Sequence, residues 1–215
     1  QHYRRLVRTQ LLLVSSVAVA PFLITFGAQE WELPDSVAAT FLTVRIVSHI
    51  LGAFIVGRVS DLHGNRRVII LGAAATTMTA IVVLLSAILT PDAMVTVVGR
   101  DISLRVLVLC IGFVGVGLSM AAIFPGYVNY MMDIAPRRKR PSYFGFASMA
   151  IVPGGLAPLA FGAMADTVGF VAIFATAVAL GAIGVVFALR IAEPREILAR
   201  QDDETRQSDD SPSKV

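Results

Sequence analysis

One basic residue, Arg45, lies inside a long apolar stretch that runs from Val37 to Gly57. A guanidinium keeps its charge and donates several hydrogen bonds, so it binds carboxylate, phosphate or carbonyl oxygens. His49 follows four residues later, a spacing that puts both side chains on one face of a helix. An imidazole changes its charge near neutral pH and also forms hydrogen bonds. Arg45 and His49 therefore predict a site for an anionic or polar solute, with Ser48 beside them.

A purely structural role for Arg45 stays open, because a carboxylate or carbonyls of another helix would also satisfy it. The apolar runs of this sequence hold no Asp or Glu. An acidic partner would therefore come from a loop, from another chain or from the solute itself. Asn129 and Tyr130, near the end of another apolar run, either line an inner vestibule or make packing hydrogen bonds.

The elements that carry these residues are predicted to cross a membrane. Hydrophobic residues make up 56% of the 215 residues and charged residues 15%, well below the roughly 25% charged residues of soluble domains. A bilayer-spanning helix needs about 20 apolar residues, and such runs cover residues 10–28, 37–57, 68–89, 106–132, 143–164 and 168–191. The chain is therefore expected to be an all-α membrane protein, a bundle of six transmembrane helices. Residues 1–9 precede the bundle as a cytoplasmic lead-in, and residues 192–215 are expected to form a disordered cytoplasmic tail.

Several other classes of protein are not expected. Strict two-residue alternation is absent, which disfavours an outer-membrane barrel, and the basic residues are not clustered as in a nucleic-acid-binding module. The sequence holds no phosphate-binding loop and no H-E-x-x-H or G-x-S-x-G motif. Its three His and one Cys have no metal-ligand spacing. We therefore expect no enzyme, no metal, no cofactor and no nucleic-acid partner.

The charges of the loops predict the orientation. Fifteen of the 18 basic residues fall on one side of the predicted bundle: Arg4, Arg5, Arg8, Arg58, Arg66, Arg67, Arg137, Arg138, Lys139, Arg140, Arg190, Arg195, Arg200, Arg206 and Lys214. Cytoplasmic loops are enriched in Lys and Arg. Both termini are therefore expected in the cytoplasm, with the protein a multi-pass component of the plasma or inner membrane.

The turn between the second and third spans carries a motif, G-R-V-S-D-L-H-G-N-R-R, at residues 57–67. It resembles the loop signature of the major facilitator superfamily, G-x-L-A-D-R-x-G-R-[KR]-[KR]. The residues that match are Gly57, Asp61, Gly64, Arg66 and Arg67. Leu62 and Asn65 replace basic residues of the signature, which leaves no basic side chain for a charge relay at either position.

A second stretch, residues 133–145, is similar to the loop between the tenth and eleventh helices of facilitator proteins. The resemblance implies that the chain is one half of a facilitator fold, a 3+3 inverted repeat that holds helices seven to twelve. It also implies a partner, which is an N-terminal six-helix half or a second copy of the chain. Asp61 would then dock at a helix N-terminus of the missing half.

The fifth run contains Pro153, Gly154, Gly155 and Pro158. These residues predict a helix break at mid-membrane, a feature of transporter sites and gates, although a plain proline kink would fit as well. Taken with the resemblance, the sequence predicts secondary active transport of a small polar or anionic solute by alternating access, coupled to an ion gradient. The alternative is a non-transporting, half-size membrane scaffold or partner subunit.

Overall fold

The computed structural model describes residues 2–89, 91, 93–97 and 99–193. Most of the predicted tail, residues 194–215, therefore lies outside the described residues. The elements in chain order are α1 (His2–Val17), α2 (Ala20–Glu30), α3 (Ser36–His63), α4 (Asn65–Leu89), β1 (Met94–Val97), β2 (Arg100–Ser103), α5 (Leu104–Ile134), the 3₁₀ turn η1 (Arg137–Lys139), α6 (Arg140–Gly155), α7 (Ala157–Thr167) and α8 (Phe170–Leu189).

Within this described part, six helical segments are long and apolar enough to cross a membrane: Tyr3–Glu30, Ser36–His63, Asn65–Leu89, Leu104–Ile134, Arg140–Thr167 and Phe170–Leu189. The six-helix bundle predicted from the apolar runs is confirmed. The helices extend past the runs, and α1 begins at His2 within the predicted lead-in. Its first turns are amphipathic, because Leu6 and Val7 are buried while Arg4 and Arg8 are exposed.

Two of the six segments are interrupted, each just before a proline. The first span divides between Val17 and Ala20, and Pro21 explains the break, because its ring clashes with the carbonyl four residues earlier, that of Val17. The fifth span divides at Leu156, two residues before Pro158. The interruption of the first span was not predicted.

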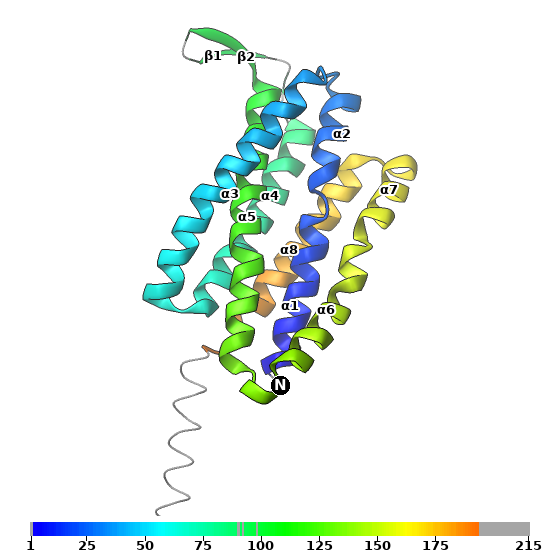
Figure 1. The fold of residues 1–215 in the computed structure, drawn as a ribbon. Coiled ribbons are helices and arrows are strands. Elements are labelled where there is room, and N and C mark those ends of the chain that lie inside the picture. Colours follow the sequence, from blue (N-terminus) through cyan, green and yellow to red (C-terminus); the bar gives the residue numbers. More distant parts are fainter. Residues whose placement is uncertain (1, 90, 92, 98, 194–215) are drawn as a thin grey trace, which may run out of the picture.

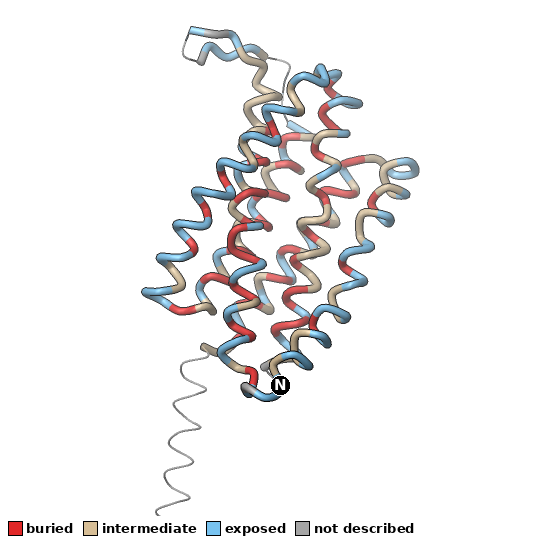
Figure 2. The backbone as a smooth tube through the Cα atoms, viewed as in Figure 1, coloured by how far each residue is buried: buried red, intermediate tan, exposed pale blue. Residues whose placement is uncertain are grey.

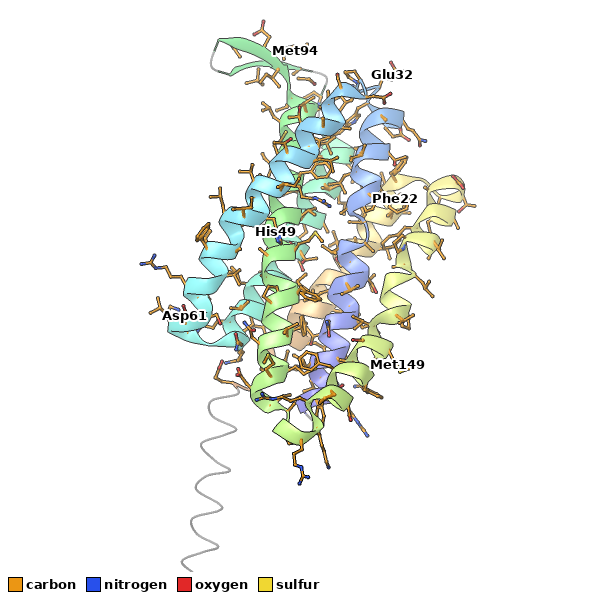
Figure 3. All side chains as sticks on the ribbon, viewed as in Figure 1. Phe22, Glu32, His49, Asp61, Met94 and Met149 are labelled. Atoms are coloured by element: carbon orange, nitrogen blue, oxygen red, sulfur yellow. The ribbon has the colours of Figure 1, made fainter. Side chains whose placement is uncertain are left out.

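A small β-hairpin caps one end of the bundle. β1 pairs with β2 in antiparallel register, from Met94 opposite Ser103 to Val97 opposite Arg100. Gly99 in the turn has φ +76°, a conformation that glycine adopts without strain. These strands are not predicted by the sequence pattern. Met94 on the hairpin and Asp61 at the end of α3 lie at opposite ends of the molecule (Figure 3).

The helices form two layers. α3, α5, α1–α2 and α6–α7 stand side by side in the nearer layer of Figure 1, and α4 and α8 lie behind them. The strongest helix contacts join α5 to α3 and α4, and α8 to α4 and α1. Buried residues concentrate along these contacts (Figure 2). The α3 and α6–α7 segments are the least buried of the six.

Aromatic rings pack one end of the core. Phe41 of α3 stacks on Phe113 of α5 with ring centroids 5.1 Å apart, and Phe26 of α2 meets Trp31 and Phe174 edge-on at 4.7 and 5.3 Å. The opposite end is built from aliphatic side chains together with the buried Tyr127 and Tyr130. These contacts hold α3 and α5 in the positions that create the site described next.

Candidate functional site

A hollow of about 190 Å³ lies between α3 and α5, lined by Arg45, Ile46, His49 and Met120. These residues fall near the middle of their helices, Ser36–His63 and Leu104–Ile134. Arg45 is partly exposed and His49 is exposed on the face of α3 that this chain does not cover. The hollow therefore places a guanidinium and an imidazole at mid-depth in the bundle.

Glycines bring the two helix backbones together behind this hollow. A Cβ on Gly117 of α5 would lie 2.5 Å from the carbonyl oxygen of Arg45 and 2.8 Å from the Cβ of Ser48. A Cβ on Gly52 would lie 3.0 Å from that of Ala121. Small residues permit this approach of membrane helices. The close contact fixes the backbone from which Arg45 and His49 project.

The charge of Arg45 is not neutralised by the residues that the structure describes. Across residues 2–89, 91, 93–97 and 99–193, the Arg45 and His49 side chains make no hydrogen bond or ion pair. A cation at the centre of a membrane costs at least about 2.5–3.5 kcal/mol on insertion scales unless it faces water or protein. The geometry thus leaves the guanidinium available to oxygen atoms from outside this chain.

The other predicted polar residues lie elsewhere. Ser48 is buried in the contact with Gly117 and does not line the hollow. Tyr130 is fully buried, and its hydroxyl donates to the carbonyl oxygen of Ala192 at 2.7 Å. The Tyr130 hydroxyl thus joins α5 to the segment that follows α8. Asn129, beside it, is exposed.

The loop motif forms a polar junction at the end of the bundle that carries the first residue of α1. Gly64 has φ +86°, and its N–H donates to the carbonyl oxygen of Ser60 at 2.9 Å, ending α3. The Ser60 hydroxyl donates to Asn65 Oδ1 at 2.7 Å, and Asn65 Nδ2 donates to Asp133 Oδ2 at 2.7 Å. Asn65 thus joins the α3–α4 turn to α5 through an amide rather than through a basic side chain.

The same junction reaches the segment that follows α8. Arg66 donates to the carbonyl oxygen of Leu189 at 3.1 Å, and a Cβ on Gly64 would collide with the carboxylate of Glu193. Asp61 and Arg67 are exposed. A Cβ on Gly57 would meet no atom within 4 Å, so the face of α3 at Gly57 is open. The motif therefore contacts α5 and the end of α8 on one side, while its other side, at Gly57 and Asp61, is exposed.

The predicted helix break is present in the backbone. α6 ends at Gly155 and α7 begins at Ala157, with Pro158 in its first turn. Gly154 packs on α1, where its Cβ would lie 3.0 Å from Ser15 Oγ and 3.2 Å from the Leu11 carbonyl oxygen. At the break, Gly154 therefore packs on α1, whereas Pro153 and Gly155 on either side of it are exposed.

Sequence reasoning missed Ile46 and Met120 as lining residues of the hollow. Met120 belongs to a different helix, and only the contact of α3 with α5 brings it beside Arg45. The one sequence signal available was the glycine series of α5, which marks a close helix contact without saying which helix makes it. No group of His, Cys, Asp or Glu suited to a metal ion occurs among the residues that the structure describes.

Comparison with known proteins gives one family. The sequence matches the family described as Major Facilitator Superfamily over residues 10–212. A search of curated protein sequences gives no match.

Two solved structures share the fold. The inward-open xylose transporter XylE from E. coli superposes with a TM-score of 0.63 at 16% sequence identity, covering 98% of this chain and 52% of that one. A D-xylose–proton symporter gives a TM-score of 0.62 at 20% identity, covering 97% and 53%. The chain therefore spans about half the length of these transporters.

Proposed function

Because the chain belongs to the Major Facilitator Superfamily, we propose that it forms one six-helix half of a secondary active transporter. The second half is another six-helix bundle, either a separate segment or a second copy. In this arrangement the two bundles rock about a cavity near the middle of the membrane, so that a small solute gains access to each side in turn. An ion gradient, with protons the first candidate, supplies the energy.

The observation that carries this proposal is the hollow at Arg45 and His49. It lies at mid-depth on an uncovered face, and no described side chain neutralises its guanidinium. A second bundle laid against α3 would enclose the hollow and keep Arg45 away from lipid. Arg45 would then bind an anionic or polar group of the solute, and His49 would hydrogen-bond to it.

α3 and α6–α7 each leave one face uncovered by this chain, and these faces favour contact with a second bundle. A Cβ on Gly57 or Gly145 would meet nothing within 4 Å in this chain. Glycines on membrane helices permit close helix approach. We place the interface along these faces, with Asp61 docked at a helix N-terminus of the other bundle and both termini of this chain in the cytoplasm.

Uptake by the full-length protein tests the proposal. A panel of anionic, neutral and cationic solutes is offered to proteoliposomes across pH 5–8, with wild type compared with Arg45→Ala. We expect Arg45→Ala to lower the uptake of anionic or polar solutes at least about tenfold, the effect of roughly 1.4 kcal/mol. Arg58→Ala, which removes an exposed arginine at the end of the same helix, should transport normally. Wild-type rates for Arg45→Ala would contradict the assignment.

A further inference from the structure

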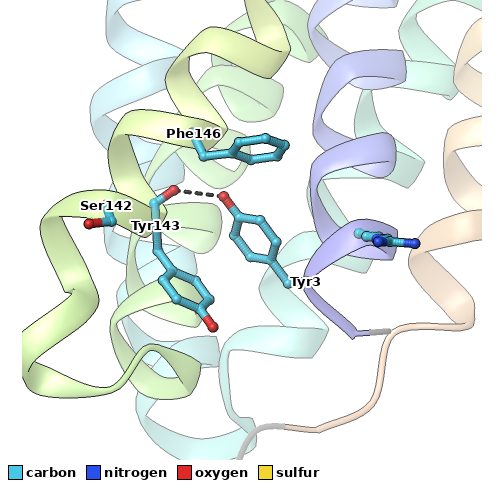
Figure 4. A pocket seen from close by; sticks show the side chains of 5 residues that line it. Tyr3, Ser142, Tyr143 and Phe146 are labelled. Atoms are coloured by element: carbon cyan, nitrogen blue, oxygen red, sulfur yellow. Dashed lines mark hydrogen bonds between the residues drawn. The ribbon is translucent and has the colours of Figure 1, made fainter.

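A second hollow lies at the opposite corner from the α3–α4 turn, between the start of α1 and the start of α6. It has a volume of about 350 Å³ and is lined by Tyr3, Arg4, Ser142, Tyr143 and Phe146. The Tyr3 hydroxyl donates to the carbonyl oxygen of Tyr143 at 2.7 Å (Figure 4). The Tyr3 ring meets the Tyr143 ring edge-on, with centroids 4.9 Å apart, and lies 5.8 Å from Phe146. The hollow therefore has rigid aromatic walls.

The charge around this hollow has one sign. Residues 2–29 and 134–165 contain no Asp or Glu, whereas they contain seven basic residues: Arg4, Arg5, Arg8, Arg137, Arg138, Lys139 and Arg140. The described carboxylates at this end belong to the other corner, where Asp133 accepts from Asn65 and Glu193 lies against Gly64. Arg4 thus lines the aromatic hollow, and neither α1 nor α6, the two helices that form it, carries a carboxylate.

Some of these cations have internal partners and others do not. Arg5 donates to the carbonyl oxygen of Arg190, and Arg140 donates to that of Met132. Within the described segments, by contrast, the side chains of Arg4, Arg8, Arg138 and Lys139 make no hydrogen bond or ion pair. Arg4 lines the hollow, and Arg8 lies one helical turn further along the same face. At least one unpaired guanidinium therefore borders the hollow directly.

We propose that this hollow binds the headgroup of an anionic phospholipid. Arg4 donates to the phosphate, and Tyr3, Tyr143 and Phe146 pack on the glycerol and the first methylenes of the acyl chains. Aromatic rings concentrate at membrane interfaces, and basic residues near the membrane surface attract anionic lipids. Charge complementarity and the position at the ends of two spanning helices favour a lipid over a soluble anion.

Native mass spectrometry of the full-length protein tests this site. The protein is released from mixed micelles that contain equal amounts of phosphatidylglycerol and phosphatidylcholine, and bound lipids are counted. We expect retained phosphatidylglycerol on wild type, an occupancy about fivefold lower for Arg4→Gln, and near wild-type occupancy for Arg4→Lys. Arg58→Gln removes the same charge at the same end of the bundle, outside the hollow, and should retain the lipid.

Three outcomes would overturn the proposal. Equal retention by wild type and Arg4→Gln would show that Arg4 binds no headgroup, as would be the case if another part of the protein filled the hollow. An equal loss of phosphatidylglycerol from Arg58→Gln would show that the lipid responds to the overall charge of the protein and not to the hollow. Displacement of the lipid by glycerol phosphate at equal concentration would assign the site to a soluble phosphate. Because none of these measurements involves transport, they are independent of the proposed transport function.

Discussion

At the scale of single residues, Asn65 shows how one amide holds a junction together. The facilitator signature has a basic residue at this position, whereas Asn65 bridges Ser60 and Asp133 with two hydrogen bonds of 2.7 Å. An amide both donates and accepts, so it can join a hydroxyl to a carboxylate. The α3–α4 turn therefore remains tied to α5 without an ion pair.

Asn65→Ala should destabilise the bundle, because it removes this bridge and leaves the Asp133 carboxylate without the amide. We expect a loss of about 1 kcal/mol in the free energy of unfolding, or a thermal midpoint lower by roughly 2–4 °C. Thermal unfolding in detergent measures it. Asn129→Ala is the matched control, because the Asn129 side chain is exposed and has no hydrogen bond within the described residues. Equal shifts for the two variants would contradict the role of the bridge.

At the same scale, the sequence identified some of the residues that line the hollow and not others. Arg45 and His49 could be paired from their spacing, because two residues that are four positions apart in a helix lie on the same face. Ser48 was grouped with them by the same reasoning, but it faces Gly117 of α5. Met120 could not be found, because which helix packs beside α3 is decided by tertiary contacts.

At the scale of elements, the position of Arg45 depends on how closely α3 approaches α5. Gly117 sets this approach, with backbone atoms of α3 where a Cβ would stand. Backbone atoms cannot move aside as a flexible side chain can, so any larger residue must separate the two helices. The hollow is therefore expected to be sensitive to α5 residues that never touch a solute.

Gly117→Ala should lower the free energy of unfolding by about 1–3 kcal/mol, the usual cost of overpacking. Gly162→Ala is the control, since a Cβ there meets nothing within 4 Å. Chemical denaturation in detergent compares the two variants. A Gly117→Ala protein as stable as the Gly162→Ala protein would show that the helices separate without cost.

The break between α6 and α7 is proposed to act as a hinge. Gly155→Ala together with Pro158→Ala restores good helix formers where the chain now turns at Leu156, and a Cβ on Gly155 has open space. We expect this double variant to insert normally and to transport at least about threefold more slowly, because an uninterrupted helix bends less easily. Uptake per inserted molecule is the measurement. Pro141→Ala, in the first turn of α6, should leave transport unchanged, and a double variant that transports as fast as wild type would refute the hinge.

Hydropathy predicted the six spanning segments because the bilayer requires long apolar helices. It did not predict the interruption after Val17, although Pro21 explains that break in the structure. The hairpin of β1 and β2 was also not predicted, because residues 93–99, which include β1, were interpreted as an apolar segment at the outer membrane surface. Short strands depend on their pairing, which is not encoded in hydropathy.

At the scale of the whole molecule, the six spanning segments differ in how much of each is buried inside the bundle. α3 and α6–α7 are its least buried segments, and both stand in the same layer, on either side of α5 and α1 (Figure 1). Half of the fold of XylE superposes on this chain. Our central claim is that a second bundle covers this layer and that water fills the space between them at Arg45.

The most direct test of this claim is the reactivity of a cysteine placed in the hollow. Ile46→Cys and Met78→Cys are compared in the full-length protein in membranes, with Cys110 replaced by alanine. Both positions are exposed in this chain and lie near the middle of their helices, but Ile46 lines the hollow of Arg45 and Met78 lies on α4 in the other layer. A charged maleimide needs a thiolate in water, so we predict labelling at position 46 and none at position 78. An unreactive cysteine at position 46, or equal labelling at both positions, would contradict the account.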